Sequence, residues 1–124
     1  MLEGKISLVT GGAGFVGSHL CERLLKGGSK VICFDNLSNG HESNIKHLEG
    51  GNGNFVFIKG DANSKEELVE VFSKFSIDYV FHYAAIVGVK RTIENPLEVL
   101  HDLTGIQNIL ELSRAANVKK FVFS

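Results

Sequence analysis

Short apolar runs alternate along the chain with longer segments in which apolar residues recur every three or four positions. The short runs predict five strands, over residues 5–9, 30–34, 55–58, 78–82 and 121–123. The first longer segment has Leu20, Leu24 and Leu25 on one helical face. Near-continuous apolar strands, each followed by a helix, are typical of a parallel sheet covered on both faces.

Turn and cap residues mark the ends of the predicted helices. Gly27 and Gly28 end the first helix, residues 43–48 predict a short one, and Ser64 to Glu67 forms a capping box that opens the next. The longest helix begins at Asn95, with Pro96 in its first turn, and Asn117 ends it. One face of this helix carries Leu100, Leu103, Gln107 and Leu110.

Right-handed crossovers between parallel strands restrict how such a sheet is wound. They favour the strand order 3-2-1-4-5, an α/β, Rossmann-like doubly wound sheet with helices on both faces. Its ligand crevice lies where the order reverses, between the first and fourth strands. We therefore expect Gly11, Ala84 and Ala85 to flank the crevice.

Three glycines follow the first strand, at Gly11, Gly14 and Gly17. In a strand–turn–helix unit, this spacing allows a sharp turn, an approach of pyrophosphate to the backbone, and close packing of helix on sheet. The helix N-terminus adds free N–H groups and a positive dipole end. A glycine-rich turn without a ligand is the alternative, and the flanking strand and helix argue against it.

Asp35 ends the second strand, about twenty residues after the glycines. A carboxylate there can accept hydrogen bonds from the adenosine ribose hydroxyls, and it would repel a 2′-phosphate. Neither Lys nor Arg occurs between Asp35 and Lys46. The pattern favours NAD over NADP as the cofactor.

Size and charge narrow the possible functions. A chain of 124 residues with a net charge of −1 fits one domain and carries no basic stripe, so we expect no nucleic-acid partner. It contains no apolar run of membrane-spanning length, so we expect no membrane partner. Cys21 and Cys33 fall on apolar segments, which predicts buried free thiols and a cytoplasmic location. The histidines and cysteines do not have the spacing of a metal-ligand cluster, so we expect no metal site.

Essentially the whole chain resembles the N-terminal half of extended short-chain dehydrogenase/reductase proteins, the NAD-dependent epimerases and dehydratases of nucleotide sugars. The matching runs are Thr10-Gly11-Gly12-Ala13-Gly14-Phe15-Val16-Gly17-Ser18, Phe34-Asp35-Asn36-Leu37, Gly60-Asp61, Phe81-His82-Tyr83-Ala84-Ala85 and Val118-Lys119-Lys120-Phe121-Val122-Phe123-Ser124.

The resemblance implies a role for each matching residue. Backbone N–H groups of Phe15 and Val16 would bind the pyrophosphate, and Asp35 the adenosine ribose, with Asn36 and Leu37 packed nearby. Asp61 and Ala62 would meet the adenine, with Asp61 accepting from its amino group. Ala84 and Ala85 would line the path towards the nicotinamide ribose. For His82 we prefer a structural hydrogen bond to a catalytic role.

Two departures from the family pattern concern catalysis. Asp102 stands three residues before Gly105, where the family often has Asn. The family's catalytic Tyr and Lys, four residues apart on one helix, have no counterpart here. The residue four positions after Tyr79 is Tyr83, and the residue four positions after Tyr83 is Val87, so neither tyrosine is paired with a lysine. Ser124 would be the first member of the family's serine run after the fifth strand, whose third member assists the tyrosine. We therefore assign no catalytic residue to this chain.

These observations predict that residues 1–124 are an NAD-binding Rossmann domain, incomplete because the family's C-terminal substrate domain is absent. The nucleotide sugar would be a partner only of the full-length parent, and apolar surface on the long helix favours a homodimer. One alternative is a stand-alone NAD-binding or regulatory module without catalysis. Another is a different Rossmann enzyme, such as a methyltransferase that binds S-adenosylmethionine, against which the glycines and the two aspartates argue.

Overall fold

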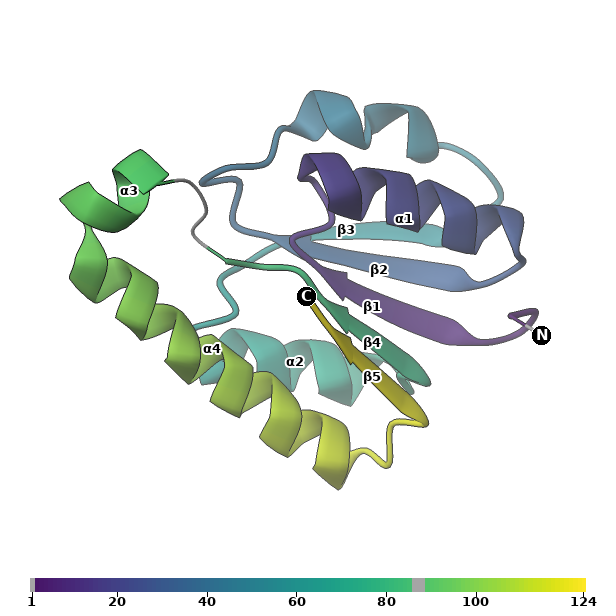
Figure 1. Cartoon of the computed structure of the whole chain (residues 1–124). Coiled ribbons are helices and arrows are strands. Elements are labelled where there is room, and N and C mark those ends of the chain that lie inside the picture. The colour runs from purple at the N-terminus through teal and green to yellow at the C-terminus, as the bar shows by residue number, and fades with distance from the viewer. Residues whose placement is uncertain (1, 86–88) are drawn as a thin grey trace.

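The computed structural model describes residues 2–85 and 89–124, which form a five-stranded parallel sheet with helices on both faces (Figure 1). The strand order is β3-β2-β1-β4-β5, as the sequence predicts. The strands are β1 (Ile6–Thr10), β2 (Lys30–Asp35), β3 (Phe55–Lys59), β4 (Tyr79–His82) and β5 (Lys120–Phe123).

Helix α1 covers one face of the sheet, and α2 and α4 cover the other (Figure 1). The described helices are α1 (Phe15–Lys26), α2 (Lys65–Lys74), α3 (Val89–Glu94) and α4 (Pro96–Ala115), with two 3-10 helices, η1 (Glu42–Asn44) and η2 (Lys46–Leu48). The two 3-10 helices replace the single short helix predicted over 43–48. Helix α3 lies where the sequence indicated no helix.

Alternation along the strands divides the core into two clusters, one on each side of the sheet. Leu8 and Ile32 belong to the cluster that includes Leu68 of α2 and Ile109 of α4. Their neighbours along the strands belong to the second cluster, which includes Cys21 and Leu24 of α1 and Ile45 of the η1–η2 segment. Successive side chains of a strand point to opposite faces, so a fully buried strand must be apolar at nearly every position.

The predicted helix caps are confirmed only in part. The Ser64 side chain accepts from the Glu67 N–H at 3.4 Å, but the Glu67 carboxylate binds the N–H of Asp61 instead of completing a capping box. Asn95 precedes α4 as expected, yet its side chain makes no capping hydrogen bond. At the other end of α4, Asn117 has a positive φ of 54°, a conformation that commonly terminates helices.

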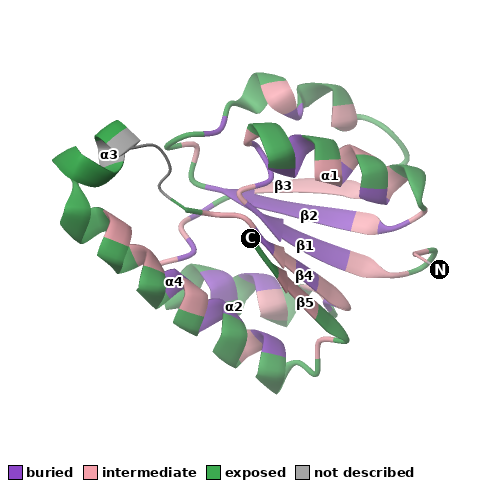
Figure 2. Ribbon diagram, in the orientation of Figure 1, coloured by how far each residue is buried: buried purple, intermediate pink, exposed green. Residues whose placement is uncertain are grey.

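Helix α4 carries apolar side chains on its exposed face as well as against the core. The buried positions of this helix are Gly105, Asn108, Ile109 and Ser113. The leucines of the face identified from the sequence are instead exposed, by 59% at Leu100 and 61% at Leu103. Much of α4 is coloured as exposed in Figure 2. No helix among the described residues is both long enough and apolar enough to cross a bilayer.

Candidate functional site

A cleft of about 1160 Å³ opens at the carboxyl ends of the central strands. Eleven of the twelve residues predicted to bind a cofactor line it: Gly11, Gly14, Phe15, Val16, Gly17, Asp35, Asn36, Asp61, Ala62, Ala84 and Ala85. The twelfth, Leu37, has a φ of 62° and packs against the apolar cluster beneath α1 instead of lining the cleft. The strand order places the cleft at the predicted switch between β1 and β4.

The glycine loop is built by close backbone approaches. Gly11 has a φ of 70°, and a Cβ there would lie 2.8 Å from the Ala84 nitrogen. A Cβ at Gly17 would collide with the Gly11 carbonyl, so this glycine permits α1 to start directly against the loop. Gly14 is different, because a Cβ there would meet only the Gly11 carbonyl oxygen, at 3.3 Å. The protein itself therefore leaves room at Gly14, and that space faces the cleft.

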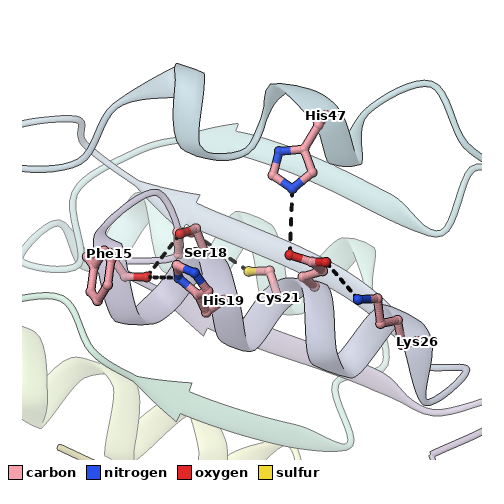
Figure 3. A network of polar contacts seen from close by, with 8 residues as sticks. Phe15, Ser18, His19, Cys21, Lys26 and His47 are labelled. Atoms are coloured by element: carbon pink, nitrogen blue, oxygen red, sulfur yellow. Dashed lines mark hydrogen bonds and ion pairs between the residues drawn. The ribbon is translucent and has the colours of Figure 1, made fainter.

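The first turn of α1 is fixed by side chains that bind the Phe15 carbonyl (Figure 3). Ser18 Oγ donates to this oxygen at 3.0 Å, and His19 Nδ1 donates to it at 2.7 Å. The Phe15 and His19 rings also lie 4.9 Å apart, between centroids. The first turn contains no acidic residue, and Gly14 provides no side-chain cap. The helix end therefore presents its positive dipole to the cleft, and no carboxylate of the first turn binds its free N–H groups.

The Asp35 carboxylate is held by backbone N–H groups from both sides. Oδ2 accepts from Ala13 at 3.0 Å, and Oδ1 accepts from Leu37 at 2.8 Å. The residue is 7% exposed and lines the cleft. Each carboxylate oxygen has two acceptor sites, so both can still accept from a ligand hydroxyl. Asp35 thus joins the glycine loop to β2 and keeps a negative charge at a fixed place in the cleft.

The loop that follows β3, residues 61–63, also lines the cleft. Asp61 Oδ1 accepts from the Asn63 N–H at 2.9 Å, and the Asp61 N–H donates to Glu67 Oε2 at 2.6 Å. Ala62, at the centre of this loop, is 8% exposed. The loop therefore has a defined shape, with a carboxylate beside a small residue.

His82 lines the cleft where β4 ends, and the buried Thr10 of β1 lies against it. Thr10 Oγ1 accepts from the N–H groups of Tyr83 at 3.1 Å and Ala84 at 3.2 Å, which leaves its proton for His82 Nδ1 at 2.7 Å. His82 is 2% exposed, and burial lowers its pKa to about 4, although the nearby Asp102 charge acts in the opposite direction. The imidazole is accordingly neutral at pH 7, with its proton on Nε2. This agrees with the structural role preferred for His82.

Both cysteines lie beneath the glycine loop as free, buried thiols, as predicted. A Cβ at Gly12 would lie 2.5 Å from Cys33 Sγ and 3.1 Å from Cys21 Sγ. The hydrogen bond with the Cys21 thiol, together with burial, raises the pKa of Cys33. Protonated thiols in this position pack against the loop and are unsuited to nucleophilic chemistry.

Other cleft residues were missed by the sequence analysis. Gly40 lies so near the glycine loop that a Cβ there would be 2.8 Å from the carbonyl carbon of Ala13. Glu94 of α3 and Glu98 of α4 also line the cleft, together with Asp102, which the sequence had already singled out. Glu98 and Asp102 are four residues apart, a spacing that puts them on one side of a helix and could have identified Glu98.

Residues 7–124 match the NAD dependent epimerase/dehydratase family over almost the entire chain. The chain belongs to this family. It is 36% identical over 119 residues to UDP-glucose 4-epimerase from Klebsiella pneumoniae, a match that covers 94% of this chain and 86% of that protein.

Solved structures show the same fold at similar identity. An epimerase from Methanothermobacter thermautotrophicus is 41% identical with a TM-score of 0.88, over 98% of this chain and 35% of that one. UDP-glucose 4-epimerase from Thermus thermophilus, in complex with NAD, is 39% identical with a TM-score of 0.85, over 95% of this chain and 36% of that one. The chain therefore spans about a third of the length of these two enzymes.

Proposed function

We propose that this chain binds NAD in the cleft and forms the cofactor-binding part of a nucleotide-sugar epimerase or dehydratase. The observation that carries the proposal is the Asp35 carboxylate, fixed at the end of β2 by the Ala13 N–H of the glycine loop. It puts a hydroxyl-binding acceptor beside a loop suited to pyrophosphate, which is what an adenosine ribose requires. Membership of a family named for NAD dependence supports the same assignment.

The cleft residues fit the cofactor from one end to the other. The loop at Gly14 and the start of α1 suit the pyrophosphate, because no side chain blocks the backbone there. Asp61 and Ala62 suit the adenine, and Ala84 and Ala85 suit the nicotinamide ribose. When bound, NAD supplies hydride acceptance and return at a sugar carbon. The residues of this chain bind and orient it.

Proton transfer in that reaction needs groups that these 124 residues do not supply. The chain has only two tyrosines, and neither has a lysine four residues further on. His82 is neutral, buried and hydrogen-bonded to Thr10, so it is no substitute. We infer that the 124-residue chain binds cofactor without turning over a sugar. The free thiols Cys21 and Cys33 support a reducing compartment such as the cytoplasm.

Titration calorimetry with NAD(H) and NADP(H) tests the proposed cofactor. NAD(H) is expected to bind more tightly, because the Asp35 carboxylate opposes a 2′-phosphate. Equal or reversed affinities would refute the choice of NAD, and no heat of binding with either cofactor would refute the cofactor site.

We also propose that the chain forms a homodimer through the exposed apolar face of α4. The support comes from three leucines of that helix, which are about half exposed or more, and from the exposed Phe123 of β5. The three leucines are Leu100, Leu103 and Leu110. A second copy would present the same leucines, and a two-fold axis lets one self-complementary patch cover itself. Large exposed apolar patches of this kind mark interaction surfaces.

A further inference from the structure

The loop at residues 61–63 is held by helices on two sides. From α2, Glu67 Oε2 accepts from the Asp61 N–H at 2.6 Å. From α4, Asn108 Nδ2 lies 3.3 Å from the carbonyl oxygens of both Ala62 and Asn63 and donates to them. Asn108 is only 7% exposed, so its amide is committed to this loop.

Helix α4 approaches the same loop through two further positions. Asp102 Oδ1 accepts from Asn63 Nδ2 at 3.4 Å. A Cβ at Gly105 would lie 2.6 Å from Asn63 Oδ1, so only glycine permits this approach without a shift. Asp102, Gly105 and Asn108 are spaced by three residues and therefore lie on one side of the helix. One side of α4 thus supports the loop, and Asn108 is the residue on it that binds the loop backbone.

We propose that Asn108 is a positioning residue that sets the preference of the cleft for adenine over other purine bases. This inference rests on the proposed binding of NAD. Asn108 fixes the Ala62 and Asn63 carbonyls, and the Asn63 N–H in turn holds the Asp61 carboxylate, which lines the cleft. The cleft then offers an acceptor at a fixed place. Adenine presents a matching donor, its 6-amino group.

Hypoxanthine presents the opposite pattern, with a carbonyl oxygen at position 6 and a proton on N1. It would direct its oxygen at the Asp61 carboxylate, so that two acceptors face each other. A correctly held loop therefore disfavours this base, because the Asp61 carboxylate then faces an acceptor where it needs a donor. If the loop is displaced, the cleft loses its preference for adenine over hypoxanthine, while the glycine loop and Asp35 can still bind the rest of the cofactor.

The test compares NAD with its hypoxanthine analogue by calorimetry on the 124-residue chain and its variants. We expect the parent chain to bind NAD about tenfold more tightly, in line with a hydrogen bond to a charged acceptor. In Asn108→Leu, which keeps the branched shape of the side chain and removes the donor, NAD affinity should fall about tenfold while analogue affinity changes little. Gln107→Ala is the control, because Gln107 is exposed on the same helix and its amide binds Glu111.

Gly105→Ala provides a second route to the same result, since its methyl group must displace Asn63. A fall in the NAD-to-analogue ratio in both variants, with the ratio intact in Gln107→Ala, supports the proposal. Equal weakening of both ligands, or an unchanged ratio, overturns it, as does a parent chain that binds NAD without preferring adenine. A parent chain that binds no NAD refutes the proposed function itself. If Asn108→Leu does not fold by circular dichroism, Asn108→Ala replaces it.

Discussion

The hydroxyl of Thr10 lies 2.7 Å from Nδ1 of His82 and joins the ends of β1 and β4 beneath the cleft. Because Thr10 Oγ1 already accepts from two backbone N–H groups, it can only donate to this nitrogen. A protonated imidazole would present a second proton to the same contact and break it. The rings of Phe121 and Phe123 stack on the imidazole, with centroids 6.5 and 6.0 Å from that of His82.

We predict a stability loss on acidification that depends on His82. Its pKa is about 4 in the folded chain against an ordinary value of 6.5, so the unfolded state binds more protons between those pH values. Stability contributed by neutral His82 is complete above pH 6.5 and falls as the pH drops towards 4, by about 3 kcal/mol in total. Urea unfolding at several pH values measures this change.

His82→Gln removes the titration and is the comparison for that experiment. The carboxylates titrate in both proteins, so the difference between their two pH profiles isolates the histidine. Parallel profiles would contradict the prediction.

Asp35→Ala should weaken NAD binding and also lower stability. The carboxylate accepts from the Ala13 and Leu37 N–H groups, so its loss leaves two buried or half-buried donors unpaired, at about 1–3 kcal/mol for each. The ratio of NAD to NADP affinity separates the two effects, because a general loosening lowers both affinities alike. We expect the preference for NAD to shrink markedly. An unchanged ratio would mean that Asp35 does not meet the ribose.

Two glycines of the loop should respond differently to substitution. Gly14→Val is expected to abolish NAD binding with a native circular dichroism spectrum, because its side chain enters the space proposed for the pyrophosphate. Gly17→Ala should instead lower the thermal midpoint, because its Cβ would strike the Gly11 carbonyl. Native NAD affinity in Gly14→Val would place the phosphate site elsewhere.

The local signals of this site were accessible from the sequence, and the long-range ones were not. Gly11, Gly17 and Asp35 are identifiable because their roles depend on a strand and a helix next to them in the chain. The Asn108 contact with Ala62 spans 46 residues, and that of Thr10 with His82 spans 72. Such pairs are set by how the sheet is wound, and no local pattern indicates them.

The same distinction between local and long-range signals explains which features of α4 were predicted wrongly. Asn95 is a residue type that commonly caps helices, but α3 ends one residue before it. The chain therefore enters α4 directly from another helix, and the Asn95 side chain makes no capping hydrogen bond. From the sequence alone, Gly105 only weakens a helix. In the structure, the lack of a side chain at Gly105 lets α4 approach Asn63 closely. Leu103 has helical periodicity but faces solvent, because periodicity identifies an apolar face without saying what covers it.

The exposed face of α4 should control the oligomeric state. Leu100→Glu combined with Leu103→Glu is expected to shift the chain from dimer to monomer in sedimentation, with cofactor affinity retained. Val69→Glu is the control, since Val69 is an exposed apolar residue of α2 and not one of the α4 leucines proposed for the interface. A parent chain that sediments as a monomer at all concentrations would contradict the homodimer.

The 124-residue chain should not oxidise any nucleotide sugar. A positioned general acid or base accelerates such a reaction by about 10²–10⁴-fold, and this chain has no Tyr–Lys pair to act as one. Orientation of the sugar against the cofactor contributes a further acceleration, which also needs residues that hold the sugar. An NADH-absorbance assay with UDP- and dTDP-sugars is expected to show no substrate-dependent signal, although NAD binds by calorimetry. Substrate-dependent NADH formation would overturn this prediction and direct attention to Tyr83, which lines the cleft beside His82. Loss of that signal in Tyr83→Phe would then show that this tyrosine replaces the family's missing one.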